Sequence, residues 1–261
     1  GPYQLMLLSA LVLLACILAS QIANRREATG PATKIQAARE PLRKEGGFRL
    51  IAQSRYLALI AALIVLLNVV NTTGEFLLGK LVVQAADQAA VGLSADAETL
   101  KRTFIGEFYG NFYWWVNLLA LLFQLFLVSR IFKYIGVRGA LFILPLIALG
   151  GYSLLLAFPL LGAVRIAKVL ENSTDYSIQN TARHALFLPT SREAKYKAKA
   201  AIDTFFWRAG DVLQAGVVFL GTRAAWDVSG FAGLNLVFVT LWLVVVALVY
   251  REHKKLSHAG A

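Results

Sequence analysis

Ionisable and amide side chains recur at regular intervals in one otherwise apolar region of the sequence, residues 160–188. They follow one another at steps of three or four residues and are Arg165, Lys168, Asn172, Asp175, Gln179 and Arg183. Such steps place side chains on one face of an α-helix. Glu171 lies one turn after Lys168 and one turn before Asp175. Lysine and arginine bind anions, and carboxylates on the same face can hold them as ion pairs.

Two other apolar regions carry the same kinds of side chain at helical spacing. They are the stretches "NVVNTTGEF" and "IDTFFWRAGDVLQAG", and their polar residues include Asn68, Asn71, Glu75, Arg208, Asp211 and Gln214. Opposite charges three residues apart on a helix can pair. We therefore expect the ion pairs Lys168–Glu171 and Arg208–Asp211.

The elements that carry these side chains are predicted to cross a membrane. The chain has 261 residues, is 58% hydrophobic and only 16% charged, and has a mean hydropathy of +0.62. Its apolar blocks are long enough to cross roughly 30 Å of hydrocarbon as helices. Seven spans are expected, at residues 3–23, 55–84, 108–132, 139–158, 160–188, 201–221 and 231–250. The fold class is thus an all-α, polytopic membrane helix bundle.

A charge in hydrocarbon costs on the order of 2.5–3.5 kcal/mol, so the polar faces of these helices cannot face lipid. They are expected to face one another around water or to pair their charges. For any single residue, a packing or ion-pair role without substrate contact is the alternative.

Basic residues concentrate in alternate connections, which explains the net charge of +11 without a nucleic-acid partner. They gather in residues 24–55, 130–138, 192–199 and 251–255, whereas the opposite connections hold only Lys101, Arg102 and Arg223 beside several carboxylates. The positive-inside rule then predicts a cytoplasmic C-terminus.

One segment predicts a boundary within the chain. Residues 24–47, "NRREATGPATKIQAAREPLRKEGG", contain proline, glycine and mixed charge but no hydrophobic run, as is typical of a linker. One expected span precedes it and six follow. We therefore expect residues 1–54 to hold the last helix of an N-terminal half and the linker, and residues 55–261 to form a six-helix bundle. The N-terminal half that this arithmetic implies would be missing from the sequence.

The sequence predicts neither an enzyme nor a metal or cofactor site. It has no P-loop, nucleophile elbow or HExxH motif, and His184, His253 and His258 lack the spacing of metal ligands. A single cysteine, Cys16, excludes an internal disulfide.

Two stretches resemble a known family. "ENSTDYSIQNTARHALFLPTSREAKYKAKAAIDTFFWRAGDVLQAG" (171–216) and "RYLALIAALIVLLNVVNTTGEFLLGK" (55–80) are similar to the ATP/ADP carriers of plastids and intracellular bacteria and their bacterial relatives. The likeness covers most of residues 48–250. It implies the major facilitator fold, with this chain as its C-terminal half, and alternating access with nucleotide exchange around a central site.

The resemblance gives the polar residues expected roles around an anionic substrate such as a nucleotide. Substrate binding is assigned to Arg165, Lys168, Asn172, Arg208 and Asn71. Gating or ion pairing is assigned to Glu75, Glu171, Asp175 and Asp211. A proton-coupling role for one of the carboxylates stays open.

Two other functions are compatible with the sequence. The chain could be a membrane anchor or signalling module that transports nothing, or a self-sufficient seven-helix receptor or channel. A seven-helix receptor or channel does not readily explain why a linker separates one helix from the other six.

Overall fold

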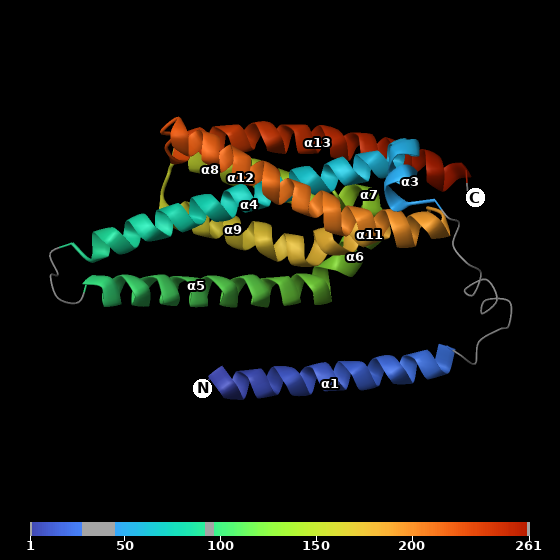
Figure 1. The fold of residues 1–261 in the computed structure, drawn as a ribbon, viewed down its shortest axis with the longest axis horizontal. Coiled ribbons are helices and arrows are strands. Elements are labelled where there is room, and N and C mark those ends of the chain that lie inside the picture. The colour runs from blue at the N-terminus through green and yellow to red at the C-terminus, as the bar shows by residue number, and fades with distance from the viewer. Residues whose placement is uncertain (1, 28–44, 92–96, 260–261) are drawn as a thin grey trace. The chain divides into compact units, whose positions relative to one another are not determined.

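The computed structural model describes residues 2–27, 45–91 and 97–259, and all its regular elements in these ranges are helices (Figure 1). Their contacts divide the chain into two compact units, Gly1–Lys44 and Glu45–Ala261. The predicted linker at 24–47 lies for the most part outside the described residues. Helix α3 (Gly47–Gln53) lies in the second unit, and the predicted division into the end of an N-terminal half and a six-helix bundle stays a prediction.

The first unit contains helix α1 (Pro2–Glu27), which is apolar on all sides. An 18-residue stretch within Tyr3–Arg25 has a mean hydropathy of 2.5, and the 23 residues are long enough to cross a membrane.

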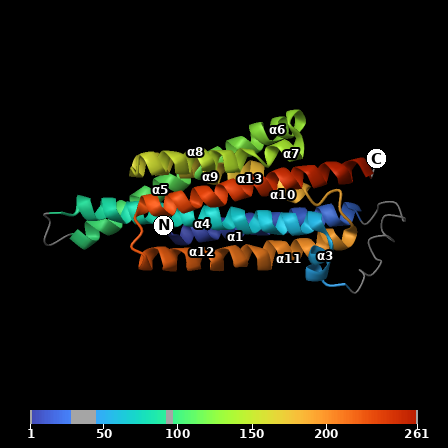
Figure 2. The ribbon, with the colours of Figure 1, turned by 90° about the horizontal axis from the view of Figure 1, so that it is seen from above.

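The second unit is a bundle of long helices around α4 (Arg55–Ala89). The other members are α5 (Ala97–Leu122), α6 (Val128–Tyr134), α7 (Gly136–Ala140), α8 (Ile143–Ala157), α9 (Leu161–Thr174), α10 (Asn180–Ala185), α11 (Lys199–Ala201), α12 (Trp207–Arg223) and α13 (Val228–Ala259). Helix α4 packs against α13, α12, α5 and α9, and Figure 2 shows it between α13 and α12. This central position explains why α4 carries so much of the buried apolar core.

In the described part of the chain, five helices are long and apolar enough to cross a membrane: Tyr3–Arg25, Arg55–Ala89, Ala97–Tyr134, Gly136–Ala157 and Val228–Leu256. The all-α, polytopic membrane class is therefore confirmed. The other two expected spans, 160–188 and 201–221, are helical but more polar. Their crossing of the membrane stays a prediction.

The polar helices contain π-helical turns, which were not expected from the sequence. A π-turn fits one extra residue into a helix and thereby rotates all later residues around the helix axis. Turn η2 (Asp175–Gln179) joins α9 to α10, and η3 (Ala194–Ala198) and η4 (Ile202–Phe206) flank α11. Turn η1 (Phe123–Leu127) joins α5 to α6. The polar stripe of 165–183 is therefore not a single straight row.

Two predicted boundaries are wrong. Helix α10 ends at Ala185, and not at Leu188, because the backbone after it forms turns with hydrogen bonds three residues apart, from Phe187 N to the His184 carbonyl and from Leu188 N to the Ala185 carbonyl. The predicted connection at 192–199 is helical and continues through η3 and α11 into α12. Its lysines are thus carried on a helix, with Lys197 Nζ donating to the Glu45 carbonyl at 3.1 Å.

Candidate functional site

A lysine lies buried at the contact between α4 and α9. Lys168 is only 1% exposed, yet its ammonium group is surrounded by polar partners. Its Nζ lies 3.3 Å from Glu75 Oε1 and 3.2 Å from Glu171 Oε1, and it donates to Asn71 Oδ1 at 2.7 Å. Two of these partners come from the neighbouring helix α4. A single cation thus joins two helices and two carboxylates, as a buried charge requires.

Of the two carboxylates in this cluster, Glu75 is the one that is open to the outside. Its side chain is 33% exposed, whereas that of Glu171 is 5% exposed. Asn172 Nδ2 donates to the same Glu75 oxygen at 2.8 Å that Lys168 approaches. Glu75 therefore covers an ammonium group and an amide donor, a pair of groups that can bind any oxyanion.

The inner side of the cluster is closed by α8 and α13. Tyr152 OH lies within hydrogen-bond distance of Glu171 Oε2 (3.3 Å) and of the Val70 carbonyl (3.2 Å), and Asn235 Nδ2 donates to the same carbonyl at 3.1 Å. A Cβ on Gly74 would lie 2.0 Å from Tyr152 OH. Glycine at 74 thus lets α4 lie close to Tyr152 of α8 and Lys168 of α9.

A second polar group joins α12 to α4. Arg208 Nη1 donates to Asp211 Oδ2 at 2.9 Å, and Asn68 Nδ2 donates to Asp211 Oδ1 at 2.7 Å. Asn68 also donates to the Trp207 carbonyl at 2.8 Å. The arginine side chain is 81% exposed. Asp211 therefore binds one N–H group of the guanidinium, whose other N–H groups make no hydrogen bond with any described residue and can bind a ligand.

Beside this group lies an open pocket of about 410 Å³, lined by Arg183, Asp203, Thr204, Trp207 and Arg208. The Arg183 guanidinium lies over the Trp207 ring at 5.0 Å from its centroid, and its Nε is buried and has no hydrogen-bond partner among the described residues. Trp207 was not among the predicted site residues. The only signal in the sequence that could have identified it is its place directly before Arg208, a predicted site residue.

The remaining two predicted residues make no hydrogen bond or ion pair with these groups in the part of the chain that the structure describes, although Asp175 is near enough to Arg183 and Lys168 to interact with them electrostatically. Arg165 hydrogen-bonds Asn111 on α5 and lies over the Phe108 ring at 5.5 Å. Asp175 is half-buried at the start of turn η2 and makes no ion pair with any described residue. Both expected ion pairs, Lys168–Glu171 and Arg208–Asp211, do form.

The predicted residues thus form one cluster, one surface pair and two separate positions. The cluster contains Asn71, Glu75, Lys168, Glu171 and Asn172, and the surface pair is Arg208 and Asp211. Lysine, arginine and amide donors held by carboxylates can bind an anion and release it again. The proposed division into substrate-binding and gating residues stays a prediction.

Comparisons with known proteins agree with the resemblance seen in the sequence. The chain is 24% identical over 164 residues to ADP,ATP carrier protein 1 of Chlamydia pneumoniae, which covers 53% of this chain and 32% of that protein. It is 31% identical over 98 residues to ADP,ATP carrier protein 5 of Rickettsia bellii, and this match covers 35% of this chain and 20% of that protein. The identity to ADP,ATP carrier protein 1 of Chlamydia trachomatis is 26% over 170 residues, and this match covers 55% of this chain and 30% of that protein.

The chain thus spans less than a third of the length of these relatives, which are named as carriers and not as enzymes. No solved structure matches it significantly. The family model described as TLC ATP/ADP transporter matches residues 4–253, nearly the whole chain. The chain is a multi-pass membrane protein that belongs to the TLC ATP/ADP transporter family.

Proposed function

We propose that the protein exchanges ATP for ADP across a membrane by alternating access. The observation that carries the proposal is the buried Lys168, which ties α4 to α9 through Asn71 and Glu75. The names of the relatives support the choice of substrate. Family membership does not favour a membrane anchor that transports nothing.

The substrate phosphates would bind Lys168 and Arg208, with Arg165, Asn71 and Asn172 adding donors. Glu75 is the accessible carboxylate on Lys168, so an incoming phosphate competes with it for the same ammonium and amide groups. Glu171, Asp211 and Asp175 would keep the cations ionised and in place between transport steps. Replacement of one anion by another leaves no buried charge unpaired at any stage.

A second helical bundle would complete the cavity. The relatives are more than three times as long as the regions that match this chain, which supports an N-terminal half that faces this one. Alternating access would then be a rocking of the two halves about the site. We place the protein in a bacterial inner membrane, with its C-terminus in the cytoplasm.

The test is counter-exchange in liposomes. The full-length protein is reconstituted in vesicles loaded with ADP, and uptake of labelled ATP is measured with and without internal ADP. We expect saturable uptake that requires internal nucleotide. Arg208→Ala should lower kcat/KM by at least about tenfold, the value of one charge-assisted hydrogen bond of about 1.5–3 kcal/mol.

Arg102→Ala is the matched control, because Arg102 is also an exposed arginine paired with a carboxylate on its own helix, Glu98 at 3.0 Å. Its uptake should equal that of the unmodified protein. Absence of saturable nucleotide uptake, or equal uptake by both variants, would contradict the proposed site.

A further inference from the structure

A basic pocket lies at the end of α13, outside both the Lys168 cluster and the Arg208 pair. It has a volume of about 520 Å³ and is lined by Arg55, Leu248, Tyr250, Arg251, Glu252, Lys254 and Lys255. Pockets that bind small molecules have volumes of roughly 300–1,000 Å³. Four of these side chains are cationic and only one is a carboxylate. The pocket thus suits an anion.

Part of this positive charge is not neutralised within the chain. Glu252 pairs with Lys255 at 2.9 Å and approaches Arg55 at 3.9 Å. Arg251 and Lys254 are exposed and make no ion pair with any described residue. Two cations are therefore available to a ligand that carries phosphate.

The apolar side of the pocket continues into an exposed stripe along α13. Val237, Leu241 and Val244 are 49–55% exposed, and Leu248 follows them at the pocket. Steps of three and four residues put these side chains on one helix face, and the same steps lead on to Arg251 and Lys255. This face is thus apolar over several turns and becomes basic where the membrane-spanning part ends at Leu256.

The aromatic residue between the two parts is held in place. The Tyr250 ring lines the pocket, lies under the Arg138 guanidinium at 5.3 Å and contacts Phe142 at 6.3 Å between ring centroids. Tyrosine is typical of the depth at which hydrocarbon meets lipid headgroups. Its position marks this level on α13.

From these observations we propose that the pocket binds the headgroup of an anionic phospholipid, whose acyl chains lie along Val237, Leu241 and Val244. Phosphate is the group recognised, and it could also be presented by a free phosphate or a nucleotide. The apolar stripe favours the lipid, because a water-soluble phosphate would make no use of it. Basic pockets beside membrane-spanning helices bind such headgroups.

The test measures the stabilisation of the purified full-length protein in detergent by short-chain lipids. Dioctanoyl phosphatidylglycerol should raise Tm in a saturable manner, and this rise should depend on Arg251 and Lys254. At equal concentration, dioctanoyl phosphatidylcholine, inorganic phosphate and ATP should give no saturable rise in Tm that depends on these two residues. In Arg251→Gln/Lys254→Gln the apparent affinity for the anionic lipid should fall about 25-fold, since each basic residue contributes about a factor of five. If this double variant does not fold, Lys254→Gln alone should give about a fivefold loss.

Arg49→Gln/Lys195→Gln is the matched control, because both residues are exposed and lie outside the pocket, and their replacement removes the same charge from the chain. Its lipid affinity should be unchanged. An equal loss in this control, an unchanged affinity in the pocket variant, or stabilisation by inorganic phosphate through the same two residues would overturn the lipid site. None of these outcomes depends on ATP/ADP exchange.

Discussion

At the scale of single residues, Lys168 determines how charge is arranged inside the bundle. Its ammonium group is nearly inaccessible to solvent, and Glu75, Glu171 and Asn71 supply the partners that it needs. Removing one partner from a buried ion pair is costly because the other charge stays buried without compensation. This cost gives a test of the cluster that is independent of transport.

Lys168→Met is expected to lower the free energy of unfolding by about 3–5 kcal/mol, since Glu171 would remain buried without a cation. The measurement is unfolding of the full-length protein in detergent, followed by tryptophan fluorescence.

Lys101→Met provides the control with the same substitution. Lys101 pairs with Asp87 at 2.7 Å, but the two side chains are 35% and 55% exposed, so solvent screens the pair and the loss should be much smaller than for Lys168→Met. Equal losses in the two variants would mean that Lys168 is not a buried, paired charge.

At the scale of the helices, close contact between α4 and its neighbours brings the polar groups within reach of one another. Gly74 lies where α4 meets Tyr152 of α8 and Lys168 of α9. A methyl group there would lie 2.0 Å from the tyrosine hydroxyl and 3.1 Å from the lysine nitrogen. Further along the same helix, at Gly79, the nearest atom would be 3.6 Å away.

Gly74→Ala should therefore destabilise the protein by about 1–3 kcal/mol, because the helices must move apart to admit the methyl group. Gly79→Ala should be neutral or slightly stabilising, since alanine favours a helix and the contact is ordinary. Thermal unfolding of both variants in the same detergent compares them directly. A loss in Gly79→Ala as large as in Gly74→Ala would contradict this packing of α4 against α8 and α9.

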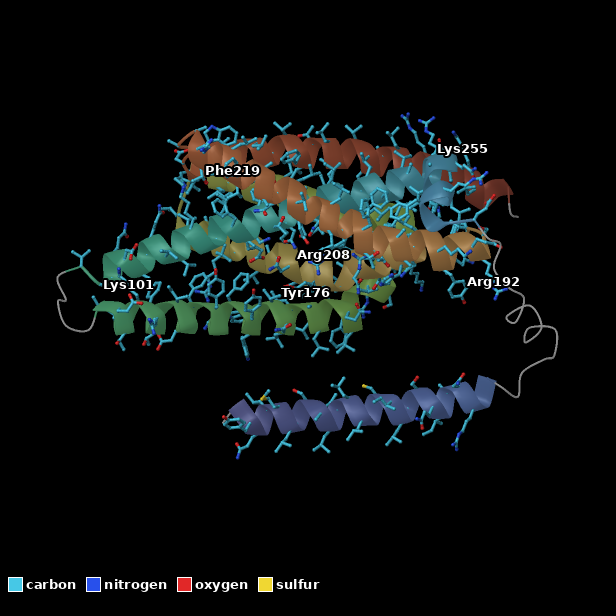
Figure 3. All side chains as sticks on the ribbon, in the orientation of Figure 1. Lys101, Tyr176, Arg192, Arg208, Phe219 and Lys255 are labelled. Carbon is cyan, nitrogen blue, oxygen red and sulfur yellow. The ribbon has the colours of Figure 1, made fainter. Side chains whose placement is uncertain are left out.

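At the scale of the whole second unit, basic residues gather at one end of the bundle. Figure 3 shows Arg192 and Lys255 at one end and Lys101 at the other. The end with Arg192 and Lys255 also contains Arg55 and Arg251, at the start of α4 and near the end of α13. The charge asymmetry seen along the sequence is thus also an asymmetry in space.

A reporter fused to the C-terminus tests the orientation that this asymmetry predicts. In bacteria, a C-terminal green fluorescent protein should fluoresce and a C-terminal alkaline phosphatase should be inactive, because both report a cytoplasmic position. The reverse result would place the basic end outside the cytoplasm. A fusion of the phosphatase after Arg223 should be active and serves as the control.

The sequence by itself determined the helical membrane class, the family and the two ion pairs within single helices. Apolar length and helical spacing are local properties, so Lys168 with Glu171 and Arg208 with Asp211 could be predicted from steps of three residues.

Only the tertiary structure decided which residues meet across helices. Three contacts depend on how helices pack: the approach of Lys168 to Glu75 and Asn71, the hydrogen bond from Arg165 to Asn111, and the position of Arg183 over the Trp207 ring. Each π-turn rotates all later residues of its helix around the helix axis and so changes the side to which their side chains point. Spacing along the sequence does not reveal where the extra residue is inserted.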